Sequence, residues 1–351
     1  MISAGSRRVA LFGALLAALL LVGACTSDEP EPGDEQEATS APEKPEAPPI
    51  CPLTGEDPPR GVDVSRPAVA LKIENSPEAR PQTGLEQADI VYEEIVEGGV
   101  TRFMAIYHCH DAAEGGPVRS ARFDDPKIAK PFTRILAFSG ANGIVLNELK
   151  EQKLITLDEE SAAGPLFRVP PGSTDVHSVF GNTVQLRRLA KKKRDVAPPR
   201  SSFFEFGDVP EGVRRARSVV LHFNPTNEIS WRWKKDKWVR SEAGVPFNSS
   251  GGEQIGTPNL LVQEVDVNNS TSITDVAGNP SPDIDLGGNG RAFLFRDGRV
   301  IKGTWKASKN GVPSFETAAG DPFTFEVGST WIELVPSKKG SVQGSIEFGR
   351  K

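Results

Sequence analysis

The chain has 351 residues, 37% of them hydrophobic and 25% charged, which is long enough for two domains and apolar enough to bury a core. The net charge is −6, and residues 26–50 contribute −7 of it while residues 1–25 contribute +2. Residues 51–351 are therefore nearly neutral, which argues against nucleic acid as a partner. No apolar run reaches the roughly 18 residues that a membrane span needs, so a polytopic membrane protein is excluded.

The first 25 residues have the three parts of an export signal. Arg7 and Arg8 precede an apolar stretch over residues 9–22, and the small residues of LVGAC lead to Cys25. The spacing resembles a bacterial lipobox, which implies diacylglycerol on the Cys25 thiol, cleavage before it, and acylation of the new terminus with a fatty acid such as palmitate. An ordinary secretory peptide is the alternative. We expect a lipoprotein signal peptide and a chain anchored by lipid to the extracellular face of the membrane.

Residues 26–50 have a different composition from the rest of the chain. They are rich in Glu, Pro, Ser, Asp and Ala and contain no aromatic residue. Such a stretch cannot bury enough apolar surface to fold, so we predict a disordered, acidic, Pro-rich tether.

Two cysteines remain for the folded part, Cys51 and Cys109. Export places them in an oxidising compartment, where a pair tends to form a disulfide. We expect a bridge that holds the start of the folded region in place, and two buried free thiols are the alternative.

The pattern over residues 51–205 predicts strands that alternate with helices. Strands are expected at 66–74, 89–95, 101–108 and 134–138, and helical segments at 85–88, 124–130, 144–152 and 182–194. This alternation is typical of an α/β domain.

After a predicted linker, 206–217, helical periodicity is nearly absent. Strands are expected at 219–223, 229–233, 238–241, 260–267, 291–295, 299–304 and 330–335, with a hairpin turn at Arg296-Asp297-Gly298-Arg299. The pattern therefore predicts a mainly antiparallel β domain over residues 218–336, followed by a tail at 337–351. The predicted fold class is α+β, an N-terminal α/β domain followed by this β-rich domain.

The run GPVRSAR contains the first candidate ligand-binding residues, Arg119 and Arg122. Guanidinium groups bind carboxylate or phosphate through two parallel hydrogen bonds, so both side chains can serve one anionic group. The alternative is that they pair with local acids such as Asp124 or Asp125.

Two loops that follow predicted strands could complete this site. The SGANG loop, with Gly140 and Asn142, precedes a helix, where backbone N–H groups can bind an anion, although a tight turn would have the same sequence. A polar cluster follows the first strand, where α/β proteins place ligands, unless it serves only as turn. Its candidate residues are Glu74, Asn75, Arg80 and Gln82.

Histidines and lysines raise two further hypotheses. On a strand, His108 and His110 would share one face, and His177 could serve as a third metal ligand. No acid is placed to support such a metal site, so we predict neither a metal nor a cofactor. The basic run at residues 187–194 could face anionic lipid or wall polymer, or could be the solvated end of a helix.

Six stretches carry a family resemblance: PLTG (52–55), RPAVALKIEN (66–75), ARPQTGLEQADIVYEEIVEGGVTRFMAIY (79–107), GPVRSAR (116–122), GRAFLFRDGRVIKGTW (290–305) and TWIELVP (330–336). In these the chain resembles the YerB-like lipoproteins of Gram-positive bacteria, a family defined by two domains of unknown function. The resemblance implies an exported, membrane-anchored, two-domain protein and no established reaction. Where the family pattern would place a segment like PHN, the chain has DVHS, which keeps a histidine at His177.

Two functions from different classes follow. The first is a non-enzymatic lipoprotein whose N-terminal domain binds an anionic envelope ligand or a partner protein. The second is a cell-envelope enzyme, of hydrolase or phosphotransferase type, acting on a phosphorylated or carboxylated glycan. It would draw its acids from residues 89–97 and use His177 as a base. A carboxylate within hydrogen-bond reach of His177, beside Arg119 or Arg122, would favour the enzyme.

Overall fold

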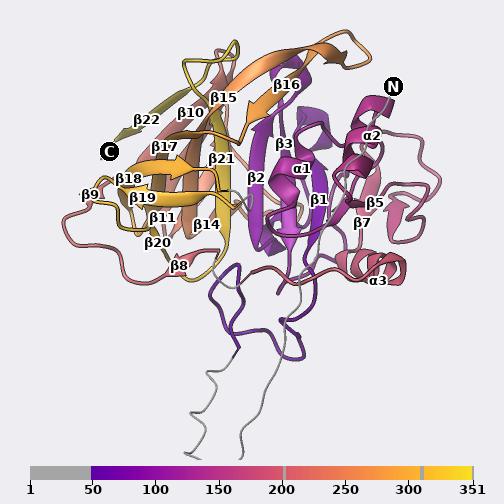
Figure 1. The fold of residues 1–351 in the computed structure, drawn as a ribbon, viewed down its shortest axis with the longest axis horizontal. Helices are drawn as coiled ribbons and strands as arrows, with labels where there is room; N and C mark the ends of the chain where they lie inside the picture. The colour runs from indigo at the N-terminus through magenta and orange to yellow at the C-terminus, as the bar shows by residue number, and fades with distance from the viewer. Residues whose placement is uncertain (1–48, 201–202, 309–311, 350–351) are drawn as a thin grey trace, which may run out of the picture. The chain divides into compact units, whose positions relative to one another are not determined.

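A computed structural model of the chain describes residues 49–200, 203–308 and 312–349. A long central sheet passes through the whole of this body (Figure 1). Its strands lie in the order β19 (Ser314–Thr317), β18 (Arg299–Lys306), β17 (Asn289–Arg296), β15 (Asn259–Thr274), β21 (Thr330–Pro336), β2 (Ile90–Ile95), β3 (Thr101–Tyr107), β1 (Val69–Glu74), β4 (Ile135–Ala137) and β5 (Ile155–Leu157), with β16 (Pro280–Asp285) on β15 and β9 (Arg214–Arg215) on β18.

A second, antiparallel sheet packs against the C-terminal part of the central one. Its order is β13 (Val245–Pro246), β12 (Lys237–Glu242), β11 (Asn227–Lys234), β10 (Ser218–Asn224) and β22 (Ser345–Gly349), with β14 (Gly256–Thr257) beside β12. Aromatic side chains fill the space between the two sheets: the rings of Trp231 and Trp331 lie 5.3 Å apart, and those of Trp238 and Phe295 lie 5.4 Å apart. Edge-to-face pairs of this kind stabilise a core beyond the apolar area they bury.

Short elements complete the body. Two small sheets pair β8 (Glu205–Phe206) with β20 (Thr324–Phe325) and β6 (Leu166–Arg168) with β7 (Val179–Gly181). The helices are α1 (Asp125–Ala129), α2 (Gly143–Glu151) and α3 (Thr183–Lys193), with single 3₁₀ turns η1 (Pro77–Ala79), η2 (Leu85–Gln87) and η3 (Glu97–Gly99). The three α-helices pack on the half of the central sheet that contains β1, β3, β4 and β5.

Caps and turns agree with the local sequence. The side chains of Asn142 and Asn182 accept hydrogen bonds from the N–H groups of Val145 and Gln185, which are otherwise unpaired at the start of α2 and α3. The predicted hairpin joins β17 to β18, and Gly298 has a φ of 63° there with a Cβ position only 2.9 Å from the Trp233 ring. Glycine is required at that position because a side chain would be both strained and crowded.

The α+β fold class is confirmed, and the predicted strands and helices are present with ends displaced by a few residues. The N-terminal sheet is mixed, since β2 and β1 run antiparallel to β3 while β4 and β5 run parallel to β1. Strand β21, from the C-terminal half, pairs in parallel with β2, so both halves of the chain contribute to one sheet. The described residues accordingly form one compact unit. The linker and tail regions contribute β9 and β22 to the sheets.

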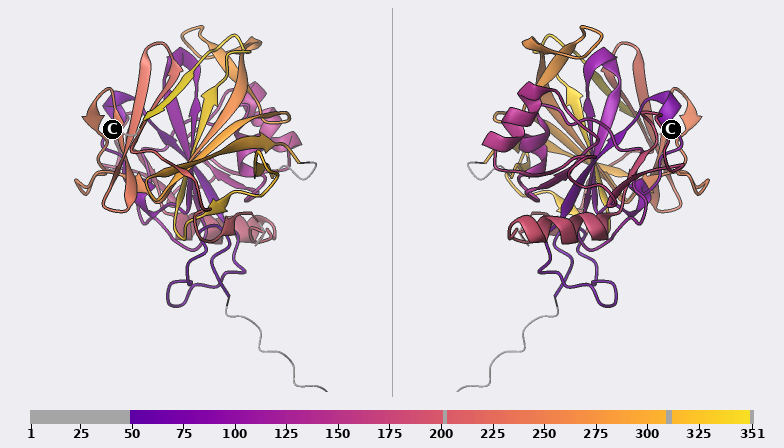
Figure 2. Two further views of the ribbon diagram at one scale, coloured as in Figure 1. Left: turned by 90° about the vertical axis from the view of Figure 1, so that its left-hand side faces the viewer. Right: turned by 90° about the vertical axis from the view of Figure 1, so that its right-hand side faces the viewer.

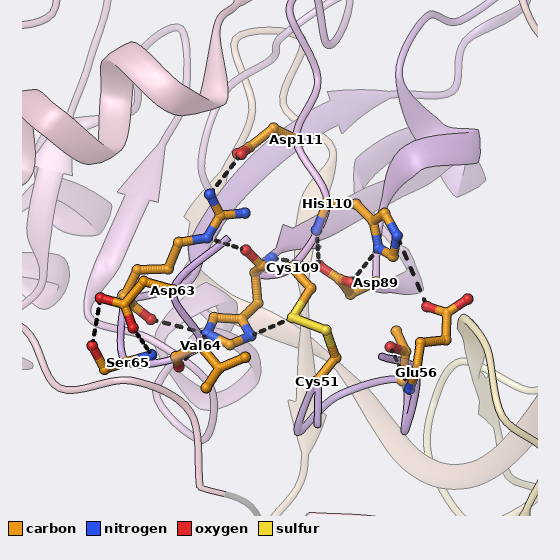
Figure 3. Close-up of a disulfide and its surroundings, with 12 residues drawn as sticks. Cys51, Glu56, Asp63, Val64, Ser65, Asp89, Cys109, His110 and Asp111 are labelled. Carbon is orange, nitrogen blue, oxygen red and sulfur yellow. Dashed lines mark hydrogen bonds and ion pairs between the residues drawn. A yellow bond between two sulfur atoms is a disulfide. The ribbon is translucent and has the colours of Figure 1, made fainter. Parts of the chain in front are cut away.

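The predicted disulfide between Cys51 and Cys109 is present, with a Cα–Cα separation of 6.0 Å (Figure 3). It ties the first described residues to the segment after β3, where His110 Nδ1 lies 2.8 Å from Asp89 Oδ1. Cys25 and the predicted tether, which continues to Ile50, lie outside the described residues except for Pro49 and Ile50. Across the described ranges no helix has the length and apolar character needed to cross a membrane.

Candidate functional site

The register of the central strands places charged side chains on both faces of the sheet. Arg102, at the start of β3, lies directly opposite Glu74 on β1 and Glu94 on β2. Residues directly opposite each other point to the same face, while their neighbours in sequence point to the other. Glu74 and Arg102 therefore share one face of the sheet, and Glu93 and Thr101 share the opposite face.

On the face of Glu74 and Arg102 lies a cavity of about 660 Å³, which we call the arginine pocket. Its walls come from β3, from the GPVRSAR segment, from the loop before α2, from β6, and from the turn between β15 and β16. The polar and charged side chains in its lining are Glu97, Arg102, Arg119, Ser120, Arg122, Ser139, Asn142, Glu159, Arg168, Thr274 and Asp275.

Three of the four arginines have a carboxylate partner. Arg119 Nε lies 3.0 Å from Glu74 Oε1, and the equivalent pairs are Arg122 with Glu97 and Arg168 with Glu159. These arginine side chains keep between 18% and 28% of their surface exposed, so each pair sits at the wall of the pocket in contact with solvent.

The fourth arginine, Arg102, is different. It is only 8% exposed, its Nη1 donates to Ser120 O at 3.2 Å, and its buried Nε has no partner. Within the part of the chain that the structure describes, no carboxylate lies within salt-bridge distance of it. Burial, and next the nearby charge of Arg122, lowers the pKa of Arg102 to about 9, so it remains a cation at neutral pH.

Glu94, the acid opposite Arg102 on β2, forms an ion pair with Lys72 and so does not pair with Arg102. Lys72 is fully buried and contacts both Glu94 and Asp125, with 2.6 Å between Lys72 Nζ and Asp125 Oδ1. Burial lowers the pKa of Lys72 below its ordinary value. Glu94 is therefore taken up by this ion triad, and Arg102 feels the charges of Glu97 and Glu74 only from beyond salt-bridge distance.

A histidine–carboxylate pair lies beside the pocket. His177 Nδ1 lies 2.8 Å from Glu74 Oε2, while the other oxygen of Glu74 contacts Arg119. If Nδ1 donates to Glu74, Nε2 becomes the proton acceptor of the ring. Nε2 has no partner among the described residues, and the preceding residue, Val176, lines the pocket.

Two of the predicted loop residues border the pocket. Gly140 and Asn142 both belong to its lining, and Gly140 O accepts from the Ala121 N–H at 2.9 Å, which joins the SGANG loop to the GPVRSAR segment. The Asn142 side chain is already used to cap α2. The backbone of this loop therefore forms part of the pocket wall, while the Asn142 side chain caps α2.

The other predicted residues lie elsewhere. Asn75 points to the opposite face, where its Nδ2 donates to Thr101 Oγ1 at 2.7 Å, and Arg80 pairs with Glu242. Gln82 Nε2 donates to the Glu74 carbonyl at 2.9 Å and so supports the backbone of the pocket from behind. None of these three side chains is part of the pocket lining.

Asn75 and Arg80 belong to what we call the closed cluster, a second set of buried charges. At its centre Arg240 Nη2 lies 2.7 Å from Glu93 Oε1 and 2.8 Å from Glu242 Oε2. Arg240 is fully buried, and its guanidinium lies 4.1 Å from the Phe247 ring centre. The members of the closed cluster are Asn75, Arg80, Glu93, Thr101, Arg240, Glu242 and Glu333.

Sequence reasoning missed Arg102 and Arg168 in the pocket. Arg102 lies within a run that reads as a buried strand, and only the pairing of β1 with β3 places it opposite Glu74. Arg168 belongs to β6, which the sequence does not predict. A charged residue inside an otherwise apolar strand was the available signal for Arg102.

The histidines considered for a metal are separated. His108 Nε2 contacts the Val64 and Arg66 carbonyls, His110 pairs with Asp89, and His177 lies at the pocket. In residues 49–200, 203–308 and 312–349, no group of three or more His, Cys, Asp or Glu residues is arranged to hold a metal ion.

Comparisons with known proteins agree with the resemblance seen in the sequence. Residues 53–197 match the family described as "Protein of unknown function (DUF3048) N-terminal domain", and residues 219–332 match its C-terminal domain. "Putative lipoprotein YerB" of Bacillus subtilis is 29% identical over 294 residues, which cover 82% of this chain and 86% of that protein.

The fold is also found in a solved structure. The crystal structure of YerB from Bacillus subtilis superimposes with a TM-score of 0.70 at 27% identity and covers 85% of this chain and 99% of that one. Sequence and fold agree over nearly the same length. The chain belongs to the YerB-like family, which is defined by the DUF3048 N-terminal and C-terminal domains.

Proposed function

We propose that this protein is a lipoprotein, held by a lipid on Cys25 at the extracellular face of the membrane, that binds an anionic group of an envelope ligand in the arginine pocket. The lipobox-like sequence before Cys25 supports the anchor, as does the name of the Bacillus subtilis relative. The nearly neutral body and the specific pocket support a defined small group over a long polyanion.

The observation that carries the ligand proposal is that Arg102 is buried with no carboxylate within salt-bridge distance among the described residues. A buried guanidinium without a counter-ion is costly, and its cost falls when an anion enters with good geometry. Arg119 and Arg122 each form an ion pair with one carboxylate through Nε, and a phosphate or carboxylate could accept hydrogen bonds from N–H groups that these arginines and Arg102 leave unused. Each charge-assisted hydrogen bond of this kind contributes about 1.5–3 kcal/mol.

The binding proposal is tested by thermal unfolding with inorganic phosphate, pyrophosphate and glucuronate as probes. A ligand that binds the native state raises Tm, because it stabilises that state by RT ln(1 + [L]/Kd). We expect at least one probe to raise Tm, and Arg102→Gln to weaken its binding about 10- to 100-fold. Arg291→Gln is the matched control, because Arg291 is 61% exposed and pairs with Glu264 on another strand. Equal binding by Arg102→Gln and wild type would remove the pocket from the proposal.

The anchor is tested separately. Cys25→Ser should abolish lipid attachment, so the protein should leave the membrane fraction or remain unprocessed. Metabolic labelling with a fatty acid reports the modification directly. A normally processed Cys25→Ser protein that stays in the membrane fraction would contradict the anchor and would leave the ligand proposal untouched.

The pair formed by His177 and Glu74 favours a second function, hydrolysis or transfer of a phosphoryl or acyl group. A carboxylate that receives a hydrogen bond from Nδ1 orients the ring and leaves Nε2 to take a proton from water or a hydroxyl. The arginines would stabilise the negative charge that develops on the group under attack.

Turnover of p-nitrophenyl phosphate and p-nitrophenyl acetate tests this second function. We expect His177→Gln to lower kcat by about 100-fold or more while the Tm response to pyrophosphate persists. Absence of turnover in wild type with intact binding would leave the protein as a non-enzymatic ligand-binding lipoprotein.

A further inference from the structure

The C-terminal end of α3 carries a dense patch of exposed cations, which we call the basic patch. Its residues are Arg188, Lys191, Lys192, Lys193 and Arg194, with Lys150 and Lys153 from α2 and the turn after it. Arg194 Nη2 donates to Lys153 O at 2.6 Å, so the two groups are continuous. Among the described residues, none of these seven side chains forms a salt bridge, in contrast to every arginine of the pocket except Arg102.

Nearby acids offset only part of the charge of the patch. Asp63 and Asp158 are close enough to feel the charges of Lys191 and Lys193, and the exposed Glu151 and Asp195 adjoin Lys150 and Arg194 in the sequence. Seven cations against these four acids therefore leave a local excess of positive charge on a body whose net charge is close to zero. Such a local excess attracts an anionic surface, because it is not cancelled within a Debye length.

The patch lies at the end of the molecule from which the predicted tether leaves. Arg187, on the inner face of α3, donates through Nε to Pro67 O at 2.8 Å and pairs with Asp111 at 2.8 Å. These contacts hold α3 against the segment just before β1, and the Cys51–Cys109 disulfide fixes the start of the body nearby. Both views in Figure 2 show α3 lying across the end where residues 49–66 are found.

We propose that the basic patch docks on anionic phospholipid headgroups of the membrane to which the chain is anchored. The inference rests on the proposed lipid anchor for its location. Twenty-four residues separate Cys25 from Ile50, and a chain of that length reaches at most about 85 Å, so the anchored body can bring the patch to the bilayer surface. Exposed Lys and Arg side chains near an anionic bilayer are each attracted to it by the headgroup charge. Docking would turn the opposite end of the body away from the membrane.

Sedimentation with phospholipid vesicles tests the docking surface without the lipid anchor. The exported chain with Cys25→Ser, which retains the whole compact body, is mixed with vesicles of phosphatidylglycerol and phosphatidylcholine or of phosphatidylcholine alone. We expect binding only to the anionic vesicles, falling as salt is raised. Lys191→Glu/Lys192→Glu should weaken that binding by about tenfold or more.

The matched control reverses two lysines at the other end of the sheet. Lys338 and Lys339 are exposed and follow the end of β21, whose first residue, Thr330, donates its N–H to Asp89 O beside the disulfide segment. Lys338→Glu/Lys339→Glu changes the net charge equally, so it should bind vesicles nearly as wild type does. Equal losses in both variants would show a dependence on net charge alone and overturn the proposal.

Other outcomes are equally informative. Binding to glycerol-phosphate wall polymer without binding to vesicles would assign the patch to that polymer and reject the membrane. Equal binding to neutral and anionic vesicles would reject the electrostatic mechanism. These outcomes test the docking surface and not the ligand pocket. The rise in Tm caused by pyrophosphate should be the same in Lys191→Glu/Lys192→Glu as in wild type.

Discussion

Two buried arginines lie against opposite faces of the central sheet, Arg102 from its strand β3 and Arg240 from β12 of the second sheet, and they have opposite electrostatic environments. Arg240, in the closed cluster, is fully buried and contacts the carboxylates of Glu93 and Glu242. Arg102, in the arginine pocket, is 8% exposed and contacts only a backbone carbonyl. Burial alone would lower the pKa of both, but the carboxylates around Arg240 raise its pKa above the ordinary value, whereas that of Arg102 falls to about 9.

This difference separates a structural charge from one that can serve a ligand. The closed cluster joins strands from both halves of the chain and includes the buried acid Glu333, whose carboxylate accepts a hydrogen bond from Trp231 Nε1 at 2.7 Å. The pocket is open to solvent, and its Arg102 has no carboxylate within salt-bridge distance among the described residues. Replacing Arg240 should therefore lower the stability of the protein, while replacing Arg102 should change it little until a ligand is bound.

The largest effect is expected from Arg240→Met. The substitution leaves Glu93 buried without a cation and Glu242 with Arg80 alone, which should lower the free energy of unfolding by about 3–5 kcal/mol. Urea denaturation followed by tryptophan fluorescence measures the change. A loss below about 1 kcal/mol would show that the closed cluster does not hold the two halves together.

A pH-dependent effect is expected from Glu333→Gln. Burial, followed by repulsion from Glu93, raises the pKa of Glu333 well above its ordinary value of 4.5. The native state thus holds a proton that the unfolded state has lost, so stability declines as pH rises from 4.5 through the raised pKa. Because glutamine does not titrate, the variant should gain relative to wild type by up to about 1.4 kcal/mol per pH unit in that window. A constant difference between the two proteins across pH would contradict this.

A small effect of opposite sign is expected from Arg102→Met. Without ligand, the substitution removes a buried cation that has no counter-ion, so the free energy of unfolding should stay the same or rise by up to about 2 kcal/mol. The stabilisation by a bound anion should disappear in the same variant. If Arg102→Met unfolds the protein as Arg240→Met does, Arg102 is a structural brace.

The smallest change in stability is expected from Arg291→Gln, which serves as a reference for the other substitutions. Arg291→Gln breaks an exposed pair with Glu264 and should change the free energy of unfolding by no more than about 1 kcal/mol. A similar loss at Arg291 and Arg240 would mean that burial does not distinguish these arginines.

Local sequence was sufficient for most elements and for part of the site. Apolar alternation predicted β1, β2 and β3, Asn142 and Asn182 marked helix starts, and Asp297-Gly298 marked a hairpin. GPVRSAR and the SGANG loop both contribute to the pocket. The short strands β5, β6 and β7 were not predicted because three residues carry too little periodic signal.

The grouping of the polar residues after β1 could not be obtained from their closeness in sequence. Glu74 and Asn75 are neighbours, yet one reaches Arg119 and His177 and the other reaches Thr101 and Glu242. The two-residue period of a strand sends them to opposite faces. Only the packing of the second sheet on one face decides which of them meets solvent and which is enclosed.

The sequence by itself determined the family, the fold class, the cysteine pair and the candidate arginines of GPVRSAR, because these depend on local pattern and composition. The tertiary structure alone decided that strands of both halves form one sheet and that Arg102 lacks a counter-ion. It also decided that α3 lies at the end where the body begins. Those features depend on which distant segments become neighbours, and β21 beside β2 or Arg102 opposite Glu74 is set by strand pairing across the whole chain.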